Sequence, residues 1–453
     1  MSATDSSPGA GMRPGGSPVS TVEFASQAIL AINAPTAPAR KILVYSINFP
    51  PELVGVGKYV GELTSWLVKA GHEVRVVTAP PYYPQWATLP GYRSRWYSSE
   101  QWAGARVFRA PLYVPTRPTG IRRLLHLASF ALTSLPSLFR NLFWRADLVL
   151  VVEPPVLCAP AAWAFSRLSG AKAWLHVQDF EVNAGYSLGL LRNRLARLVV
   201  LTLEKWLMAR FDRVSSICEA MLSLARDKLA WRQAPFLFPN WVDIDEIRPL
   251  AGPSRFRESL GIPADSIVIL YSGSMGVKHG LDLILEAAAA LESERDIVFV
   301  ICGNGATQAP LQAAGVHLSN LCFLDLQPPE ALNELLGLAD IHLLPQRASA
   351  ADLVLPSKLG GMLASGRPVV TTAATGTELA RVVQDRGVVV PPEDSAALAR
   401  AVLALARDPE KRATFGAAGR AYACENLERD KILRRFEREV VRVTTGTHEH
   451  GSC

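Results

Sequence analysis

Cysteine is scarce in this chain of 453 residues, which holds six of them at positions 158, 218, 302, 322, 424 and 453. They lie far apart and form no C-x-x-C pair, so neither a disulfide scaffold nor a structural zinc site is expected, and a reduced cytosolic protein fits better. Blocks of charge are also lacking, because the net charge of +6 comes from scattered arginines. That excess weakly favours acidic partners such as nucleotides or anionic lipid headgroups, and we expect no nucleic-acid partner.

Residues 117–144 are rich in Leu, Phe and Trp, but they contain no apolar run long enough to cross a bilayer. There His126, Ser134, Pro136 and Arg140 interrupt a series of Leu, Phe and Trp, whereas a transmembrane helix needs roughly 20 mostly apolar residues. The stretch is either a packed helical hairpin or a segment that lies on the membrane surface. The second interpretation gives a cytoplasmic protein, peripheral on the cytoplasmic face of the inner membrane.

The chain is long enough for two domains. Hydrophobic residues make up 49% of it, which is ample for two cores. Residues 1–40 are rich in Ser, Gly, Pro and Ala and lack the apolar centre of a signal peptide, so we expect a disordered tail. A change of pattern at 241–250 predicts an N-terminal domain over 41–245 and a C-terminal domain over 246–427.

The first domain begins with alternating strand and helix patterns, which are typical of an α/β doubly wound sheet. An apolar strand at 41–47 leads through a glycine-bearing loop into a helix over 58–69 and a second strand. Gly55 and Gly57 precede the helix, with Lys58 beside them. They either let the backbone approach a ligand or serve only the turn.

Two further features of the first domain suggest substrate binding. Residues 79–120 are rich in Tyr, Trp, Pro and Arg and look too polar and broken for the core, so they form either an aromatic binding surface for sugars or an ordinary long loop. A strand expected to run to about Phe180 ends in a polar cluster that includes Asp179 and Glu181. These carboxylates either cap the next segment, or bind hydroxyl groups and act as a base.

The second domain places three loops at the ends of parallel strands. The loop after 267–272 contains Gly273, Ser274 and Lys278, and the strand at 297–302 leads into Gly303 and Gly305. Open α/β sheets bind ligands at the carboxyl ends of their strands, so these loops should face one crevice.

The third loop follows a strand at 341–344. Ser357 occupies an expected helix N-cap, and Lys358 falls in the first turn, where the helix dipole disfavours a cation. A bound anion, such as a nucleotide diphosphate, would explain that lysine. The alternative is a solvated lysine on an ordinary loop.

Over residues 41–435 the sequence resembles glycosyltransferase family 4, whose members have the GT-B fold of two facing Rossmann-like domains. The stretch NFPPELVGVGKYVGELTSWLVKAGHEVRVVTAPPYYPQW, together with RAPLYVP and LPSKL, is similar to the colanic-acid-type enzymes of bacterial exopolysaccharide synthesis. The resemblance implies a retaining hexosyltransferase that uses a nucleotide diphosphate sugar as donor and a lipid-linked saccharide as acceptor, with no cofactor and no metal.

The resemblance also implies roles for individual residues. Gly55 and Gly57 would lie against the donor phosphates or the acceptor, and Lys278 matches the lysine of a G-x-x-x-x-K-x-G motif. Glu378 matches a glutamate before a late helix, PNWVD matches an interdomain motif, and a helix over 428–445 would cross back to the first domain. Lys278 and Lys358 would neutralise the leaving diphosphate, aided by the helix N-terminus at Ser357 and the backbone amides of Gly273 and Gly57, while Asp179 and Glu181 would orient the acceptor hydroxyl.

Four positions depart from the family pattern. Ser274 stands where an arginine is usual, Leu353 and Gly361 occupy the two positions of the E-x7-E pattern, and Val152 falls near the place of a catalytic histidine. Asp352 is the only acid within its loop and is a candidate to reach the donor sugar. These departures leave two alternatives open: a GT-B nucleotide-sugar epimerase, or a non-catalytic nucleotide-sugar-binding assembly partner.

Overall fold

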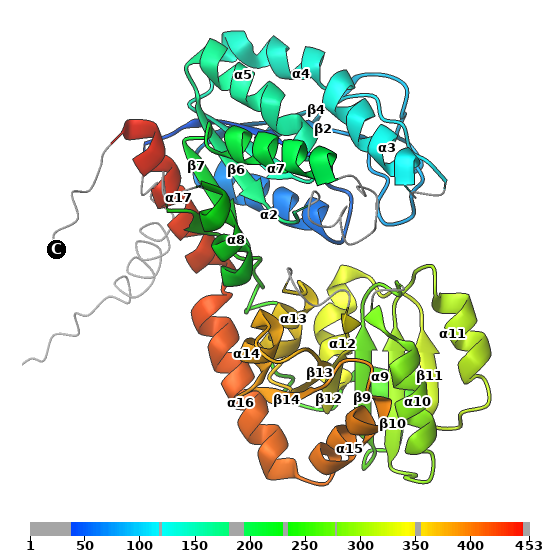
Figure 1. Cartoon of the computed structure of the whole chain (residues 1–453). Coiled ribbons are helices and arrows are strands. Elements are labelled where there is room, and N and C mark those ends of the chain that lie inside the picture. The colour runs from blue at the N-terminus through cyan, green and yellow to red at the C-terminus, as the bar shows by residue number, and fades with distance from the viewer. Residues whose placement is uncertain are drawn as a thin grey trace, which may run out of the picture.

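Two parallel sheets, each with helices on both faces, form two halves that lie one above the other in Figure 1. The computed structural model describes residues 38–116, 120–180, 194–229, 234–276, 279–348 and 355–446. The α/β class and the two doubly wound, Rossmann-like halves are thereby confirmed. The predicted N-terminal tail lies, up to residue 37, outside the described residues.

The first sheet contains eight strands among the described residues, in the order β3-β4-β2-β1-β5-β6-β7-β8. All neighbours pair in parallel except β3 with β4. In β1, Leu43 and Tyr45 point into one core while Ile42 and Val44 point into the other, so burial on both faces explains the continuous apolar run. The strands are β1 (Lys41–Tyr45), β2 (Glu73–Thr78), β3 (Ser98–Trp102), β4 (Ala105–Arg109), β5 (Leu148–Glu153), β6 (Lys172–Val177), β7 (Arg213–Ser216) and β8 (Phe236–Leu237).

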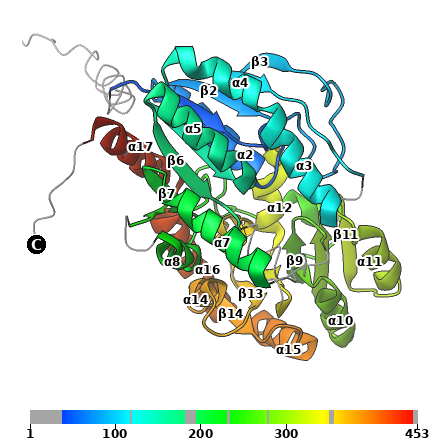
Figure 2. The same ribbon diagram turned by 45° about the horizontal axis from the view of Figure 1, so that its top comes forward.

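Helices α3, α4, α5, α7 and α8 cover one face of this sheet, and α2 covers the other. Figure 2 brings α4, α5 and α7 forward. Their bounds are α2 (Val56–Lys69), α3 (Gly120–Thr133), α4 (Leu135–Arg140), α5 (Ala159–Ser169), α7 (Arg194–Met208) and α8 (Glu219–Leu229), with short 3-10 helices η1 (Asn141–Trp144) and η2 (Val156–Cys158).

The prediction that 79–120 is too polar for the core is wrong for β4. Val107 is buried and Arg109 is only 1% exposed. The Arg109 guanidinium donates hydrogen bonds to backbone carbonyls and pairs with Glu100 on β3, so its charge is satisfied inside the protein. The sequence pattern could not show that long-range pairing.

The second sheet contains six parallel strands within the described ranges, in the order β11-β10-β9-β12-β13-β14. Helices α10, α11 and α15 pack on one face, and α9, α12, α13, α14 and α16 on the other. The strands are β9 (Ile267–Ser272), β10 (Ile297–Cys302), β11 (Leu321–Leu324), β12 (Ile341–Leu344), β13 (Val369–Thr372) and β14 (Gly387–Val390). The helices are α9 (Arg255–Ser259), α10 (Asp282–Ala290), α11 (Gln308–Gly315), η4 (Pro329–Ala331), α12 (Leu332–Leu338), α13 (Lys358–Ala364), α14 (Glu378–Val383), α15 (Ser395–Ala406) and α16 (Pro409–Asn426).

The last helix, α17 (Arg429–Thr445), returns to the first sheet, beside which it runs in Figure 1. Its side chains Leu433, Phe436 and Val440 are fully buried in the same core as Ile42 and Val44 of β1. The first half is therefore built from both ends of the described chain.

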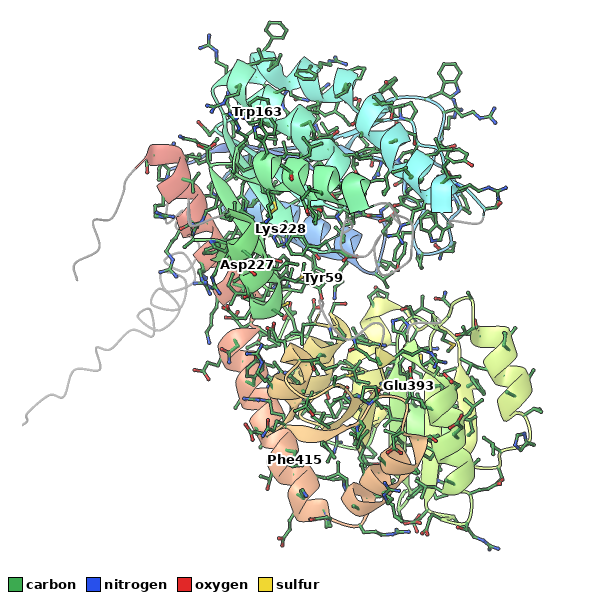
Figure 3. The ribbon with its side chains drawn as sticks, in the orientation of Figure 1. Tyr59, Trp163, Asp227, Lys228, Glu393 and Phe415 are labelled. Atoms are coloured by element: carbon green, nitrogen blue, oxygen red, sulfur yellow. The ribbon has the colours of Figure 1, made fainter. Side chains whose placement is uncertain are left out.

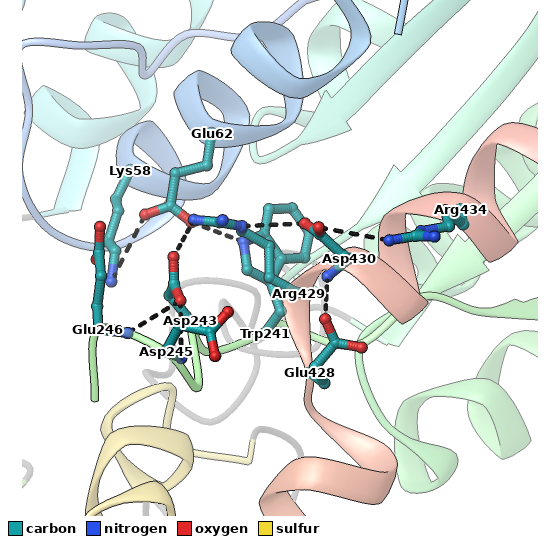
Figure 4. Close-up of polar contacts among 10 residues, drawn as sticks. All are labelled: Lys58, Glu62, Trp241, Asp243, Asp245, Glu246, Glu428, Arg429, Asp430 and Arg434. Atoms are coloured by element: carbon teal, nitrogen blue, oxygen red, sulfur yellow. Dashed lines mark hydrogen bonds and ion pairs between the residues drawn. The ribbon is translucent and has the colours of Figure 1, made fainter. Parts of the chain in front are cut away.

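Two chain segments cross between the halves and bond to each other. Val242 exchanges backbone hydrogen bonds with Leu427 and Arg429. The Arg429 side chain forms ion pairs with Asp243 and Asp430, drawn in Figure 4. We call these two segments, 239–243 and 427–430, the hinge. Predicted domain bounds at 245 and 427 fall at or beside it, and those bounds stay a prediction.

Candidate active site

Lys358, in the first turn of α13, reaches back over the carboxyl end of β9. Its Nζ donates a hydrogen bond to the Tyr271 hydroxyl at 2.7 Å and lies 4.0 Å from the centre of that ring. The side chain also covers Gly273, where an added Cβ would stand 3.2 Å from Nζ. Tyr271 in turn donates to the carbonyl of Ser274 at 2.6 Å. The lysine is therefore held directly above the loop that follows β9.

Burial lowers the pKa of Lys358 to about 7. No carboxylate among the described residues forms an ion pair with it, so the water it has lost is offset by the uncharged Tyr271 hydroxyl and ring and not by a negative charge. A bound anion would supply that compensation and would favour the charged amine. The amine is therefore suited to meet a negatively charged group at the strand ends.

Ser357 stands at the N-cap position of α13 but does not cap it. Its backbone is already helical, and its side chain makes no hydrogen bond to the first turn. The side chain bonds instead to Tyr59 of α2, in the other half. The position of the helix start was predicted correctly, and the capping role was wrong because a partner from the other half takes the hydroxyl.

Gly303 and Gly305 are each approached closely by a neighbouring loop. Their φ angles are 144° and 151°, and an added Cβ would stand 1.9 Å from the carbonyl oxygen of Gly273 and 2.4 Å from that of Met275. The Gly273 N–H donates to Cys302 at 2.9 Å. That amide is consequently not available to a diphosphate, which corrects the role predicted for it.

Three loops were predicted to converge at the strand ends. The described residues show two of these loops, together with Lys358 from the helix that follows the third. Loops 273–276 and 303–305 are joined by backbone hydrogen bonds, and Lys358 lies over the first. Ser274 is exposed beside it. Lys278, Asp352 and Glu181 lie outside the described residues.

Glu378 bridges the two halves. Its carboxylate accepts the backbone N–H groups of Glu219 at 3.1 Å and Ala220 at 2.8 Å, which open α8. A carboxylate at a helix N-terminus is favoured by the unpaired N–H groups and the helix dipole. Tyr59 makes the second bridge through Ser357, and Figure 3 labels it at the edge of the upper half that faces the lower one.

Gly55 at the N-cap of α2 and Gly57 in its first turn are each approached by a side chain of the first half. A Cβ on Gly57 would stand 2.7 Å from Oε2 of Glu52, while one on Gly55 would meet the Tyr83 ring at 3.6 Å. Lys58 pairs with Glu62 at 3.7 Å, and Glu62 also accepts the indole N–H of Trp241. Figure 4 shows that Lys58 is directed toward the hinge.

The polar cluster after β6 is partly structural. His176 is buried and shares a 2.9 Å hydrogen bond with the Ser215 hydroxyl, and burial lowers its pKa to about 3. It is therefore neutral near pH 7 and does not supply a proton. Asp179 is half-buried at the end of β6 and remains a candidate. Val152, at the place of the family's histidine, lies buried within β5.

Sequence reasoning missed several residues at these strand ends. Tyr271 is the second-last residue of β9 and holds Lys358. Arg347 follows β12, and one of its guanidinium nitrogens donates to both carboxylate oxygens of Asp282, each at 2.8 Å. Both lie at carboxyl ends of strands, which was the available signal. Glu52 and Tyr59 gave no comparable signal, because their partners are distant in sequence.

The described residues contain no candidate for a membrane-spanning helix or for a metal cluster. None of their helices is both long and apolar enough to cross a membrane. No group of three or more His, Cys, Asp or Glu side chains in them could hold a metal ion. The prediction that transfer proceeds without metal or other cofactor stays a prediction.

Comparisons with known proteins agree on the type of protein. Residues 54–241 match the family described as "Glycosyl transferase 4-like domain", and residues 254–422 match "Glycosyl transferases group 1". The putative colanic acid biosynthesis glycosyl transferase WcaI of Escherichia coli is 39% identical over 411 residues, which cover 88% of this chain and 99% of that protein.

Solved structures share the fold at low sequence identity. Sucrose-phosphate synthase from Thermosynechococcus elongatus has a TM-score of 0.69 at 17% identity, covering 90% of this chain and 100% of that one. Anabaena HepE, solved in complex with UDP-glucose, has a TM-score of 0.64 at 14% identity, covering 88% and 99%. These identities support the fold alone.

Proposed function

The chain belongs to glycosyltransferase family 4 with the GT-B fold, close to the colanic-acid type, and from this membership we propose that it transfers a hexosyl group from a nucleotide diphosphate sugar to a lipid-linked saccharide. The transfer would retain the anomeric configuration and serve bacterial exopolysaccharide synthesis. The colanic acid assignment of the Escherichia coli relative and the UDP-glucose bound to Anabaena HepE support the substrate classes.

The observation that carries this proposal is Lys358, a partly buried amine without a carboxylate partner in the described residues, which lies over Gly273. In the proposed reaction the bond between the sugar and the diphosphate breaks, and charge develops on the leaving diphosphate. Lys358, with Lys278 from the adjoining loop, would stabilise that charge. Asp179 and Glu181 would orient the acceptor hydroxyl, and no metal would be needed.

Helix α3 supports a contact with a membrane. Only His126 and Phe130 of its side chains are buried, whereas Ile121, Leu124 and Leu125 are 73%, 56% and 53% exposed. Arg122 and Arg123 lie among them. Exposed apolar side chains interleaved with arginines are suited to an anionic bilayer surface. We therefore propose that the protein binds the cytoplasmic face of the inner membrane, where it would meet a lipid-linked acceptor.

A donor screen tests this function. Purified protein is given GDP-, UDP- and dTDP-sugars with and without a lipid-linked saccharide, in EDTA and in Mg²⁺. The Lys358→Met variant should lower transfer by about 10²-fold, because one preorganised charge is lost. The exposed Lys411→Met variant should leave transfer unchanged.

The same screen separates the two alternatives. An epimerase would convert the donor into its isomer without acceptor, and an assembly partner would bind a nucleoside diphosphate without turnover. Transfer that persists in the Lys358→Met variant would contradict the role assigned to that amine.

A further inference from the structure

Glu52 joins two loops that leave neighbouring strands of the first sheet. It lies in the loop between β1 and α2, and is 3% exposed. Its Oε1 accepts the backbone N–H groups of Tyr82 and Tyr83, each at 3.0 Å, in the loop that follows β2. Its Oε2 accepts the amide of Asn48 at 2.9 Å. A single carboxylate thus fixes the second loop to the first.

Arg109 joins the same two loops with the opposite charge. Its guanidinium donates to the carbonyl of Ala79 in the second loop and to that of Pro50 in the first, each at 2.7 Å. Burial raises the pKa of Glu52, while its hydrogen bonds and the Arg109 charge act in the opposite direction. Burying two charged side chains to hold one pair of loops together is costly. This cost indicates that the position of the second loop matters for function.

Gly57 makes room for this carboxylate. A Cβ added there would stand 2.7 Å from Oε2 of Glu52 and 2.8 Å from its Cβ. Gly57 lies in the first turn of α2, where alanine is intrinsically the better helix former. The glycine is therefore explained by Glu52, and it needs no ligand to account for it.

The loop held by Glu52 carries a cluster of aromatic rings. Tyr82 and Trp86 stand 5.5 Å apart and both contact the ring of His126, at 4.6 and 5.1 Å, so the loop is joined to α3. Tyr83 and Trp86 keep part of their surface exposed. These rings follow the carboxyl end of β2, on the edge of the sheet where α/β folds bind their substrates.

We propose that Glu52 is a positioning residue for the saccharide acceptor: through the backbone of Tyr82 and Tyr83 it sets the aromatic loop on which the acceptor stacks. This inference rests on the proposed transfer to a saccharide. Glu52 touches no substrate itself. It acts on acceptor binding, whereas Lys358, in the other half, acts on the donor.

Three variants test the proposal. Glu52→Ala removes both accepting oxygens, and Gly57→Ala displaces a carboxylate that is still present. Glu52→Gln keeps one oxygen to accept the N–H groups of Tyr82 and Tyr83. Its amide nitrogen can still donate to Asn48 if the Asn48 side-chain amide rotates by about 180°. Glu100→Gln, at the partly exposed partner of Arg109, is the matched control. Octyl glycosides of one to three hexoses serve as acceptors, and UDP is the probe of donor binding. Hydrogen exchange reports on the stability of residues 79–86.

We expect Glu52→Ala and Gly57→Ala to speed exchange in 79–86 and to raise the acceptor KM by about tenfold or more, since a buried N–H pair loses its acceptor. The kcat and the Kd for UDP should stay within about twofold, which a general loss of folding would not allow. Glu52→Gln and Glu100→Gln should behave like the wild type. If Glu52→Ala does not fold, the acceptor KM of Gly57→Ala is compared with that of Glu52→Gln, which tests the same point.

The proposal is overturned if the acceptor KM is unchanged while exchange rises, if kcat falls alone, or if Glu52→Gln is as defective as Glu52→Ala. A parallel loss of UDP binding would also overturn it, since the effect would then not be specific to the acceptor. A wild type that binds UDP but transfers to no saccharide removes the proposed function and this inference together. Wild-type transfer with unaltered variants removes the inference alone.

Discussion

Lys358 is the residue whose chemistry depends most on what binds beside it. Its amine has lost much of its water and gained a tyrosine hydroxyl and ring, so about half of the molecules carry its charge near pH 7. A diphosphate would raise the pKa of this amine, because an adjacent anion favours the charged form. Binding of the donor is then coupled to the uptake of a proton.

This coupling predicts how donor affinity changes with pH. Below the free pKa of about 7 the amine is already charged, and the Kd for a UDP-sugar should be constant. Above it, binding is accompanied by uptake of a proton, so the Kd should rise by up to about tenfold per pH unit until the pKa of the bound state is reached. Isothermal titration in buffers of different ionisation enthalpy measures both the Kd and the proton taken up.

The Lys358→Arg variant is the control, because its guanidinium keeps its proton throughout this range. Its Kd should be nearly independent of pH, even if it is weaker. A wild-type Kd that does not change between about pH 7 and 9 would contradict the link between burial and binding.

Single residues also show where the sequence misleads. The stretch around Lys358 was recognised from a cation in the first turn of a helix, and the structure places it at the strand ends. The sequence leaves open whether Gly57 serves a ligand or the turn, and the family resemblance implies a ligand, whereas in the structure Gly57 faces Glu52 and Gly303 faces Gly273. A glycine pattern shows that something approaches closely, but not whether that is a ligand or another segment of the chain.

At the scale of the element, α3 differs most from its neighbours. The helices α4 and α5 beside it bury side chains along their length, while α3 is anchored by a central histidine and phenylalanine. Its first turns project an apolar and basic surface that the rest of the described chain does not cover.

We predict that Leu124→Glu with Leu125→Glu lowers binding to anionic phosphatidylglycerol vesicles by about tenfold or more, because apolar contact is replaced by repulsion. Activity on a short water-soluble acceptor should be retained. Vesicle sedimentation at two salt concentrations measures the effect. Val316→Glu, at an 83% exposed site in the other half, is the control and should bind as the wild type does. Unchanged sedimentation of the double variant would exclude α3 as the contact.

Elements were predictable where one physical pattern dominates. The strands at 41–47, 267–272 and 341–344 are apolar because both of their faces are buried, and the structure confirms them. β4 was missed because Arg109 stands within it, and its partners in the two loops are about 30 to 59 residues away.

At the scale of the whole molecule, the two halves meet through a few polar contacts and the hinge. Glu378 at the start of α14 accepts two N–H groups from α8, and Tyr59 bonds to Ser357. Two of the residues assigned to the donor site are thus engaged between the halves. The sequence predicts two domains. The contacts between them depend on how the two halves are placed relative to each other, so the sequence pattern of either half alone could not predict them.

We predict that Glu378→Ala shifts the protein toward a more open arrangement, since two charge-assisted hydrogen bonds of about 1.5–3 kcal/mol each are lost. Small-angle X-ray scattering should give a larger radius of gyration, and the melting temperature of each half should change little. Glu425→Ala, at an exposed site on α16, serves for comparison. An unchanged radius of gyration would show that the Glu378 contact is not needed to hold the halves in place.

The return of α17 to the first sheet has a consequence for synthesis. Residues 41–237 leave the ribosome long before 429–445, yet Leu433, Phe436 and Val440 are needed to close one of their two cores. While the second half is being made, the apolar face of β1 that carries Ile42 and Val44 stays without one of the helices that cover it. One core of the nascent first half therefore stays partly uncovered until α17 is translated, after the whole second sheet. During this interval the exposed apolar surface could be bound by chaperones or could aggregate.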